Sequence, residues 1–311
     1  MKYVFKVLIG LLIIPMIGSA QSSSLSGNDI VLSGKDAFAA RMKTTCNTTQ
    51  EGKTIYGMFE GKSYSRVPGE KDRHLFNVVG INVRQCDKKA DETRGDGYRS
   101  VSREIMIYLD PKTNEIMDVW TNPWTGEEVE VVHVANDPVN MRGYRYEKDE
   151  KGNDSPPFTL RNYGDLAFTS HEIPLYYDNP LGSDFQVYIG GAYHAMEIFN
   201  TAYYSEEISD RNIKDLSQSN LTWSRVAQWL PWMQMGDKAG IMVFNATGMS
   251  TFDEGKIWPA LQKVLDERYP LYKTPPPLDD PRPNETSWTV FKKYMEDKKP
   301  TSVRQKHGGR H

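Results

Sequence analysis

The chain contains 311 residues, of which 38% are hydrophobic, 11% aromatic and 25% charged, so it carries too many large apolar side chains for a disordered protein. Its formal net charge is −3, whereas a nucleic-acid-binding protein would show an excess of basic residues. The lack of a Gly-X-Y or heptad repeat and the single long apolar stretch exclude a collagen, a coiled coil and a multi-span membrane protein. The remaining class is an aromatic-rich globular protein.

Residues 1–20 have the pattern of a secretory signal peptide. The first six residues include the basic Lys2 and Lys6, an apolar run covers residues 7–17, and three small residues follow at 18–20. The run is shorter than the roughly 20 residues that span a bilayer. We therefore expect cleavage after Ala20, no membrane association of the mature chain, and a periplasmic or secreted location. Residues 21–29 are rich in serine and glycine, which predicts a flexible segment.

Cys46 and Cys86 are the two cysteines of the chain. An oxidising compartment permits a disulfide between them, which would close a loop of about 40 residues and contribute roughly 3–4 kcal/mol. The alternative is two unpaired, half-buried thiols, and the sequence leaves both open. Without a CxxC motif or a nearby pair of histidines, the cysteines predict no zinc site.

Short β-type runs separated by turn residues dominate the chain from Phe38 to Phe252. No strand–helix–strand alternation, P-loop or Gly-x-Gly-x-x-Gly motif appears, which argues against a doubly wound nucleotide-binding fold. The pattern predicts an all-β fold with minor helices, built as an antiparallel β-barrel or a highly curved sheet. The expected strands cover residues 41–48, 54–66, 75–86, 99–109, 128–134, 164–177, 185–199, 221–229 and 241–247.

Helices are expected at residues 33–41, 256–269 and 286–296. Three prolines at 275–277, followed by two more, predict an extended strap. The C-terminal helices and this strap are expected to pack outside the sheet. Residues 297–311 are polar and basic, which predicts a disordered tail. Since no internal repeat or linker occurs, residues 30–296 are predicted to form a single domain.

Strand alternation places isolated ionisable groups on faces that also carry aromatic side chains. Glu104 shares a face with Tyr108, and Arg225 shares one with Trp223 and Trp229. A solvent-exposed face would be more uniformly polar, and a closed core would hold fewer charged groups. We therefore expect these faces to line a cavity. The predicted ligand-binding residues are Tyr108, Arg142, Trp223, Arg225, Trp229 and Trp232.

Two histidines on predicted strands are candidates for proton transfer. His133 lies on an otherwise apolar face, and His194 lies beside Met196 and Tyr188 in the alternation. Each histidine is either a general acid or base that titrates near working pH, or a core residue whose ring nitrogens are satisfied by neighbours. The full set of predicted catalytic residues is His133, Glu104, His194 and Asp137.

The remaining charged candidates also have two interpretations each. Glu104 is either a base or a carboxylate paired with Arg142 or Arg225. Asp137 is either catalytic or part of a turn that ends a strand before Pro138. Arg225 either binds an anionic group of a ligand or forms an ordinary ion pair.

A string of residues in the middle of the chain resembles the signature of an uncharacterised family. It runs through Trp120–Glu127 (WTNPWTGE) to Glu130–Val139 (EVVHVANDPV), and the stretches 102–111, 229–236 and 282–288 are also similar. On these residues the chain resembles the bacterial and fungal domain-of-unknown-function family DUF1838 over nearly all of its mature length. The resemblance implies one domain of about this length, often secreted, and it supplies no reaction.

Three functions agree with these features, and the sequence leaves the oligomeric state open. The first is an enzyme that acts without a cofactor or metal on a small, partly apolar or aromatic molecule by acid/base chemistry, as a lyase, isomerase or hydrolase. The second is a lipocalin-like carrier of an apolar ligand. The third is a surface interaction protein with exposed Trp124, Trp229 and Trp232. A cavity shared by His133 and Glu104 would favour the enzyme, and an apolar cavity would favour the carrier.

Overall fold

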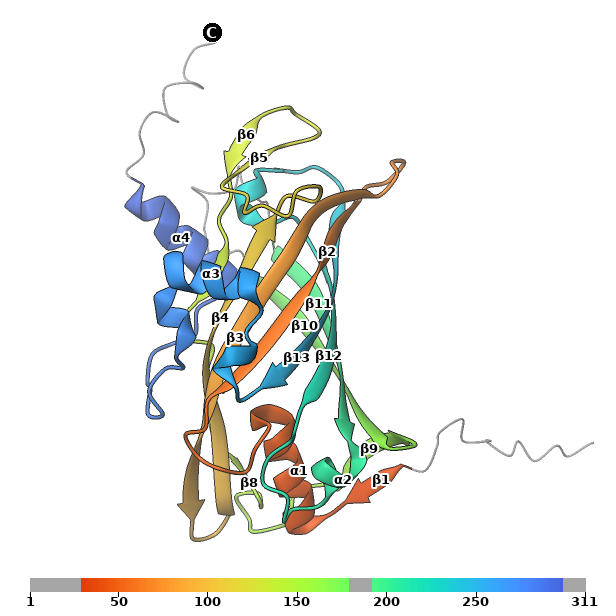
Figure 1. The fold of residues 1–311 in the computed structure, drawn as a ribbon, viewed down its shortest axis with the longest axis vertical. Helices are drawn as coiled ribbons and strands as arrows, with labels where there is room; N and C mark the ends of the chain where they lie inside the picture. Colours follow the sequence, from red (N-terminus) through yellow and green to blue (C-terminus); the bar gives the residue numbers. More distant parts are fainter. Residues whose placement is uncertain (1–28, 179–191, 299–311) are drawn as a thin grey trace, which may run out of the picture.

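The computed structural model describes residues 29–178 and 192–298. The predicted signal peptide, most of the serine-rich segment, residues 185–191 of one expected strand and the end of the tail lie outside the described residues. The described chain is mostly β, with one eleven-stranded antiparallel sheet, a two-stranded sheet and a few helices (Figure 1).

The strands are numbered in chain order. They are β1 (Ile30–Leu32), β2 (Ile55–Arg66), β3 (Arg73–Asp91), β4 (Gly95–Leu109), β5 (Val119–Thr121), β6 (Glu128–Glu130), β7 (Val134–Asn136), β8 (Arg145–Tyr146), β9 (Phe158–Tyr163), β10 (Leu166–Asp178), β11 (Ala192–Tyr204), β12 (Ser219–Ala227) and β13 (Ile241–Thr251). The helices are α1 (Gly34–Cys46), α2 (Ser205–Ser209), α3 (Pro259–Glu267) and α4 (Ser287–Asp297), with 3-10 turns η2 (Pro231–Met233), η3 (Glu254–Lys256) and η4 (Pro270–Lys273).

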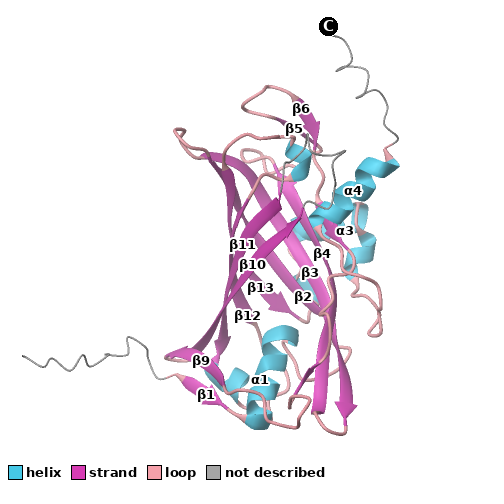
Figure 2. Ribbon diagram, turned by 180° about the vertical axis from the view of Figure 1, so that it is seen from behind, coloured by secondary structure: helices cyan, strands magenta, loops and turns pink. Residues whose placement is uncertain are grey.

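The large sheet has the strand order β1-β9-β10-β11-β12-β13-β2-β3-β4-β7, and β8 also pairs with β4. The sheet curves strongly, so that β10 and β11 pass behind β2, β3 and β4 in Figure 1 and in front of them in Figure 2. Within residues 29–178 and 192–298, no strand pairing joins β1 to β7 at the two ends of this order. The predicted antiparallel sheet is therefore confirmed, whereas a closed barrel is not observed in this part of the chain.

The strand predicted at residues 41–48 is wrong, because helix α1 continues through it to Cys46. Thr44 and Thr45 locally favour a strand because their side chains are β-branched. The helix nevertheless buries Ala40 and Met42, and this packing outweighs the weak local preference. It ends where Asn47 adopts a left-handed conformation, with φ of 55°.

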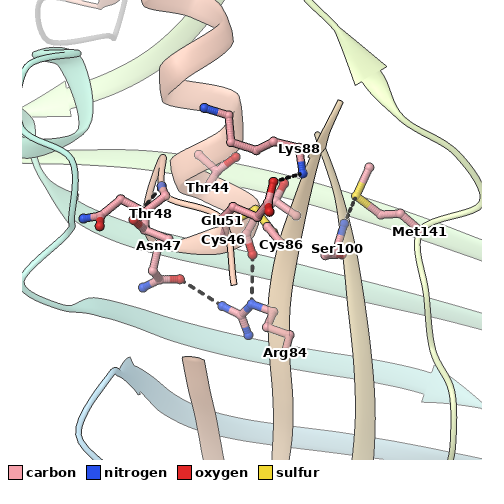
Figure 3. Close-up of a disulfide and its surroundings, with 12 residues drawn as sticks. Thr44, Cys46, Asn47, Thr48, Glu51, Arg84, Cys86, Lys88, Ser100 and Met141 are labelled. Carbon is pink, nitrogen blue, oxygen red and sulfur yellow. Dashed lines mark hydrogen bonds between the residues drawn. A yellow bond between two sulfur atoms is a disulfide. The ribbon is translucent and has the colours of Figure 1, made fainter. Parts of the chain in front are cut away.

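A disulfide joins the end of α1 to strand β3 (Figure 3). It links Cys46 to Cys86, which settles the pairing that the sequence left open. Beside it, the Arg84 side chain donates from Nε to the carbonyl of Thr45 at 2.8 Å and from Nη2 to the Asn47 Oδ1 atom at 2.9 Å. Arg84 thus places a positive charge at the C-terminus of α1, where the helix dipole is negative.

Strand alternation gives the large sheet an inner and an outer face, and each face carries an apolar core. The inner core holds most of the tryptophans and the residues around Phe76. On the outer face, Ile81 and Ile105 pack against Leu261 and Leu265 of α3. The proline-rich strap also crosses this outer face, where Gln85, Arg99 and Arg103 hydrogen-bond to backbone carbonyls between residues 271 and 278.

Helix α4 differs from the expectation that the C-terminal helices pack outside. Its N-cap Thr286 forms a capping box with Thr289. The following turn then buries Trp288 and Phe291, each 2% exposed, in the inner core. The Trp288 ring lies 5.0 Å from that of Tyr193 on β11. A curved sheet without paired ends leaves apolar side chains uncovered, and this helix face covers them.

Candidate functional site

A cavity of about 260 Å³ lies on the inner side of the curved sheet, between β4 and the strands β10 to β12. The first turn of α4 also contributes to its wall. The wall is mostly apolar, with a small number of ionisable groups. The principal apolar residues are Phe59, Met106, Leu175, Phe199, Leu221, Trp223 and Trp288, and the charged residues on the strands are Glu104, Glu197 and Arg225.

Phe59 reaches the cavity because the residue opposite it on β3 is Gly80. A Cβ atom at Gly80 would lie 2.3 Å from the Phe59 ring, so any larger residue would displace that ring. Phe59 then packs edge-on against Trp223, with ring centroids 5.5 Å apart. Together these aromatic rings give the cavity a rigid apolar side.

Arg225 forms an ion pair with Glu197 inside the cavity wall. The two residues are direct cross-strand neighbours on β12 and β11. The Arg225 Nη1 atom lies 3.1 Å from Glu197 Oε1, and Nη2 donates to the Tyr193 hydroxyl at 2.6 Å. Their side chains are only 15% and 18% exposed. Of the two interpretations of Arg225, the ordinary ion pair is therefore present.

Glu104 faces the same cavity from β4. Its Oε1 atom accepts a hydrogen bond of 2.8 Å from the Asn136 side chain on β7. Burial raises the pKa of Glu104, and the negative charge of Glu197 raises it further, against the lowering effects of Asn136 and Arg225. A carboxyl group with a raised pKa in an apolar cavity can hold or release a proton, and it can also accept a hydrogen bond from a ligand.

His133 does not line this cavity. Its ring packs on Tyr108 with centroids 5.9 Å apart, and its Nδ1 atom accepts a hydrogen bond of 3.1 Å from the Tyr108 backbone N–H. Its Nε2 atom is buried and has no hydrogen-bond partner among residues 29–178 and 192–298. Burial lowers the pKa of His133 to about 4, so the folded protein holds the neutral ring. The cavity thus does not bring His133 and Glu104 together.

This environment predicts a loss of stability in acid. Unfolding returns His133 to an ordinary pKa near 6.5, so the unfolded state binds the proton more tightly and is favoured as the pH falls from about 6.5 to about 4. The shift corresponds to about 3 kcal/mol. We expect urea unfolding to show that His133→Asn removes much of this pH dependence. The exposed His194→Asn variant should retain it, and equal profiles for both variants would contradict the assignment.

Three of the predicted ligand-binding residues lie outside the cavity and are buried in the core. Tyr108 and Trp232 are buried and form an aromatic cluster with Phe76 and Trp120. Trp229 is 3% exposed and donates from Nε1 to the Lys238 carbonyl at 2.8 Å. Since Trp229 and Trp232 are buried, they do not form the exposed aromatic surface that an interaction protein was expected to show.

The other three predicted residues lie at separate places. His194 is exposed on the outer face of β11, with its ring 4.5 Å from that of Tyr176. Asp137 forms ion pairs with Arg103 at 3.1 Å and with Arg282 at 2.9 Å. Arg142 is exposed in a different cleft. The cavity therefore unites Glu104, Trp223 and Arg225 of the predicted set.

Most of the apolar wall was not predicted, and neither were three residues that shape the polar part of the site and its rim. Glu197 and Tyr193 share one face of β11, and Trp288 belongs to a helix that was expected outside the sheet. Alternation alone separates Tyr193 and Glu197 from His194, so it signals that they share a face. It does not signal which residue on the next strand stands opposite, and that register creates the pair with Arg225.

The fold and this site define an antiparallel β-sheet protein with a mostly apolar cavity on the inner side of its curved sheet. Its sequence matches the family described as "Protein of unknown function (DUF1838)" over residues 52–295, and the chain belongs to that family, as its signature residues predicted. A search of curated proteins finds no significant match. In the parts of the chain that the structure describes, no helix is both long and apolar enough to cross a membrane.

Among solved structures, the chain is similar to a LolA superfamily protein from Nitrosomonas europaea. The sequence identity is 8%, the TM-score is 0.20, and the match covers 76% of this chain and 97% of that chain. A likeness this distant supports no inference about the ligand or the reaction.

Proposed function

We propose that this protein binds a small, largely apolar molecule in the inner cavity and acts as a carrier for it. The observation that carries the proposal is the cavity of about 260 Å³, walled by aromatic and aliphatic side chains with few polar groups. Sites of this kind typically bury most of a ligand's surface and use a few polar groups to set its orientation.

The charges in the wall narrow the class of ligand. The positive charge of Arg225 is already matched by Glu197 at 3.1 Å. Glu104 adds either a neutral carboxyl group or a negative charge, so the strand residues of the cavity provide no surplus positive charge. An anionic group would be poorly matched here. We infer a ligand with an apolar or aromatic body and a hydroxyl or amine group that donates to Glu104.

The proposal predicts that filling the cavity abolishes binding. Leu221→Trp places a large ring in the cavity from β12, and we expect at least about tenfold weaker binding of the neutral apolar dye N-phenyl-1-naphthylamine, followed by fluorescence titration. Val226→Trp is the matched control, since Val226 lies on the same strand and is 40% exposed on the outer face. Its dye binding should equal that of the native protein. Equal affinities of all three proteins, or no binding by the native protein, would contradict the proposal.

Acid/base catalysis stays a prediction. Of its four predicted residues, Glu104 lines the cavity, and its raised pKa is the property that a proton-transferring carboxyl group needs. His133, His194 and Asp137 are held elsewhere by their own contacts. This is why we favour a carrier over an enzyme.

We also propose that the mature protein acts in a periplasm or outside the cell. The basic and apolar pattern of residues 1–20 supports export. The disulfide between Cys46 and Cys86 supports it independently, because such bonds persist mainly in oxidising compartments.

A further inference from the structure

A second cleft, of about 380 Å³, lies on the other side of the sheet, where the proline-rich strap passes β4. Its wall is polar and holds more guanidinium groups than carboxylates, which makes it chemically unlike the inner cavity. The residues that line it are Arg99, Asn140, Met141, Arg142, Asp280, Pro281, Arg282, Pro283 and Asn284.

The carboxylates in and beside this cleft are fully engaged. Asp280 accepts from Arg282 Nε at 2.9 Å and from Arg282 Nη2 at 2.8 Å. Arg282 also donates to both oxygens of Asp137, which pairs in addition with Arg103. Two arginines and two aspartates therefore cancel in charge.

The other two arginines of the cleft retain unused hydrogen-bond donors. Arg142 is exposed and forms no hydrogen bond or ion pair with any described residue. The Arg99 Nε atom has no hydrogen-bond partner in the described chain, and it forms a long ion pair of 3.8 Å with Asp87 Oδ2, an oxygen that accepts from the Tyr144 hydroxyl. Arg99 Nη2 donates to the Leu278 carbonyl at 2.6 Å, which fixes this side chain in place.

The two asparagines of the cleft leave no free side-chain oxygen. Asn140 Oδ1 accepts from the Ser102 N–H at 3.0 Å, and Asn284 Oδ1 accepts from the Asn140 N–H at 2.7 Å. The Asn140 Nδ2 atom has no close hydrogen-bond partner in the described part of the chain, and the residue is 8% exposed. It lies near enough to Asp280 to assist Arg282 in lowering the pKa of that carboxyl to about 2.

The cleft thus presents an unpaired positive charge at Arg142, more guanidinium groups than carboxylates, and acceptors that are already used. We propose that it is a binding site for a small oxyanion group, a carboxylate or a phosphate, which the exposed guanidinium group of Arg142 contacts, with Arg99 and Arg282 in the same wall adding positive charge. The residues that line this cleft differ from those that line the inner cavity, and the proposal is independent of the carrier proposal.

The test is isothermal titration calorimetry of the full mature chain with inorganic phosphate and, separately, with acetate. The ionic strength of the two titrations is matched with sodium chloride. Saturable binding of at least one anion is expected, and Arg142→Ala should weaken it by about tenfold or more, since a charge-assisted hydrogen bond is lost. Arg145→Ala is the matched control, because Arg145 is an exposed arginine three residues along the chain that does not line the cleft.

Each outcome decides the proposal. Binding of phosphate alone assigns phosphorylated compounds, binding of acetate alone assigns carboxylates, and dependence on Arg142 but not Arg145 supports the site in either case. No saturable binding of either anion, or equal weakening by the two variants, would overturn it. In sodium chloride without phosphate or acetate, Arg142→Ala should unfold at the same temperature as the unaltered protein. The replaced side chain is exposed and has no hydrogen-bond or ion-pair partner among the described residues.

Discussion

Replacing Arg225 by methionine is expected to lower the free energy of unfolding by about 3–5 kcal/mol. The substitution keeps an unbranched apolar stem on β12 but removes the guanidinium that lies 3.1 Å from Glu197. Glu197, whose side chain is 18% exposed, would then hold a negative charge in an apolar wall without a cation. The Tyr193 hydroxyl would also lose its hydrogen bond of 2.6 Å from Arg225. Urea unfolding at neutral pH measures the loss.

Two further variants distinguish the cost of an unpaired buried charge from a general loss of packing. Arg225→Met combined with Glu197→Gln should recover a large part of the lost stability, because no unpaired charge remains. Arg211→Met removes an exposed pair with Asp36, at 3.5 Å and with side chains 54% and 51% exposed, and should cost less than about 1 kcal/mol. If Arg225→Met alone costs no more stability than Arg211→Met, then the expected cost of leaving Glu197 buried and unpaired is wrong.

The predictable part of the site follows from strand periodicity. Successive side chains in a strand point to opposite faces, so the positions of Glu104, Trp223 and Arg225 within their strands were enough to place them on cavity-facing sides. The antiparallel sheet was predictable for a related reason, since short apolar runs with turn signals leave no room for crossover helices. The face of each strand residue and the class of sheet both depend on residues that lie close together in the sequence.

The parts that failed depend on contacts between distant segments. The pairing of Glu197 with Arg225 is set by the register of β11 against β12, and the position of Trp288 is set by a gap in a sheet that is assembled from the whole chain. The predicted strand at residues 128–134 gave His133 a cavity-facing position, but the structure ends β6 at Glu130 and begins β7 at Val134, and the ring of His133 accepts a hydrogen bond from the backbone N–H of Tyr108. The alternation of apolar and polar residues along a strand gives no information about which distant segment that strand contacts.

Breaking the disulfide between Cys46 and Cys86 is expected to cost about 4 kcal/mol, comparable to the loss of the inner ion pair. The bond spans 40 residues, and cross-linking a loop of this length removes chain entropy from the unfolded state. It also holds the end of α1 against β3, where Arg84 makes its hydrogen bonds to Thr45 and Asn47. The check is urea unfolding of the native protein and of the variant with both cysteines replaced by alanine.

Reduction provides the matched comparison, because it breaks the bond without changing the buried volume. The native protein unfolded in urea with dithiothreitol should lose stability by a similar amount, whereas the double alanine variant should respond to dithiothreitol by no measurable shift. A thiol titration of the urea-unfolded native protein without reductant should find no free cysteine. Identical unfolding curves for the oxidised and reduced native protein would show that the 40-residue loop is already constrained in the unfolded chain, and the entropic argument for this disulfide would then be wrong.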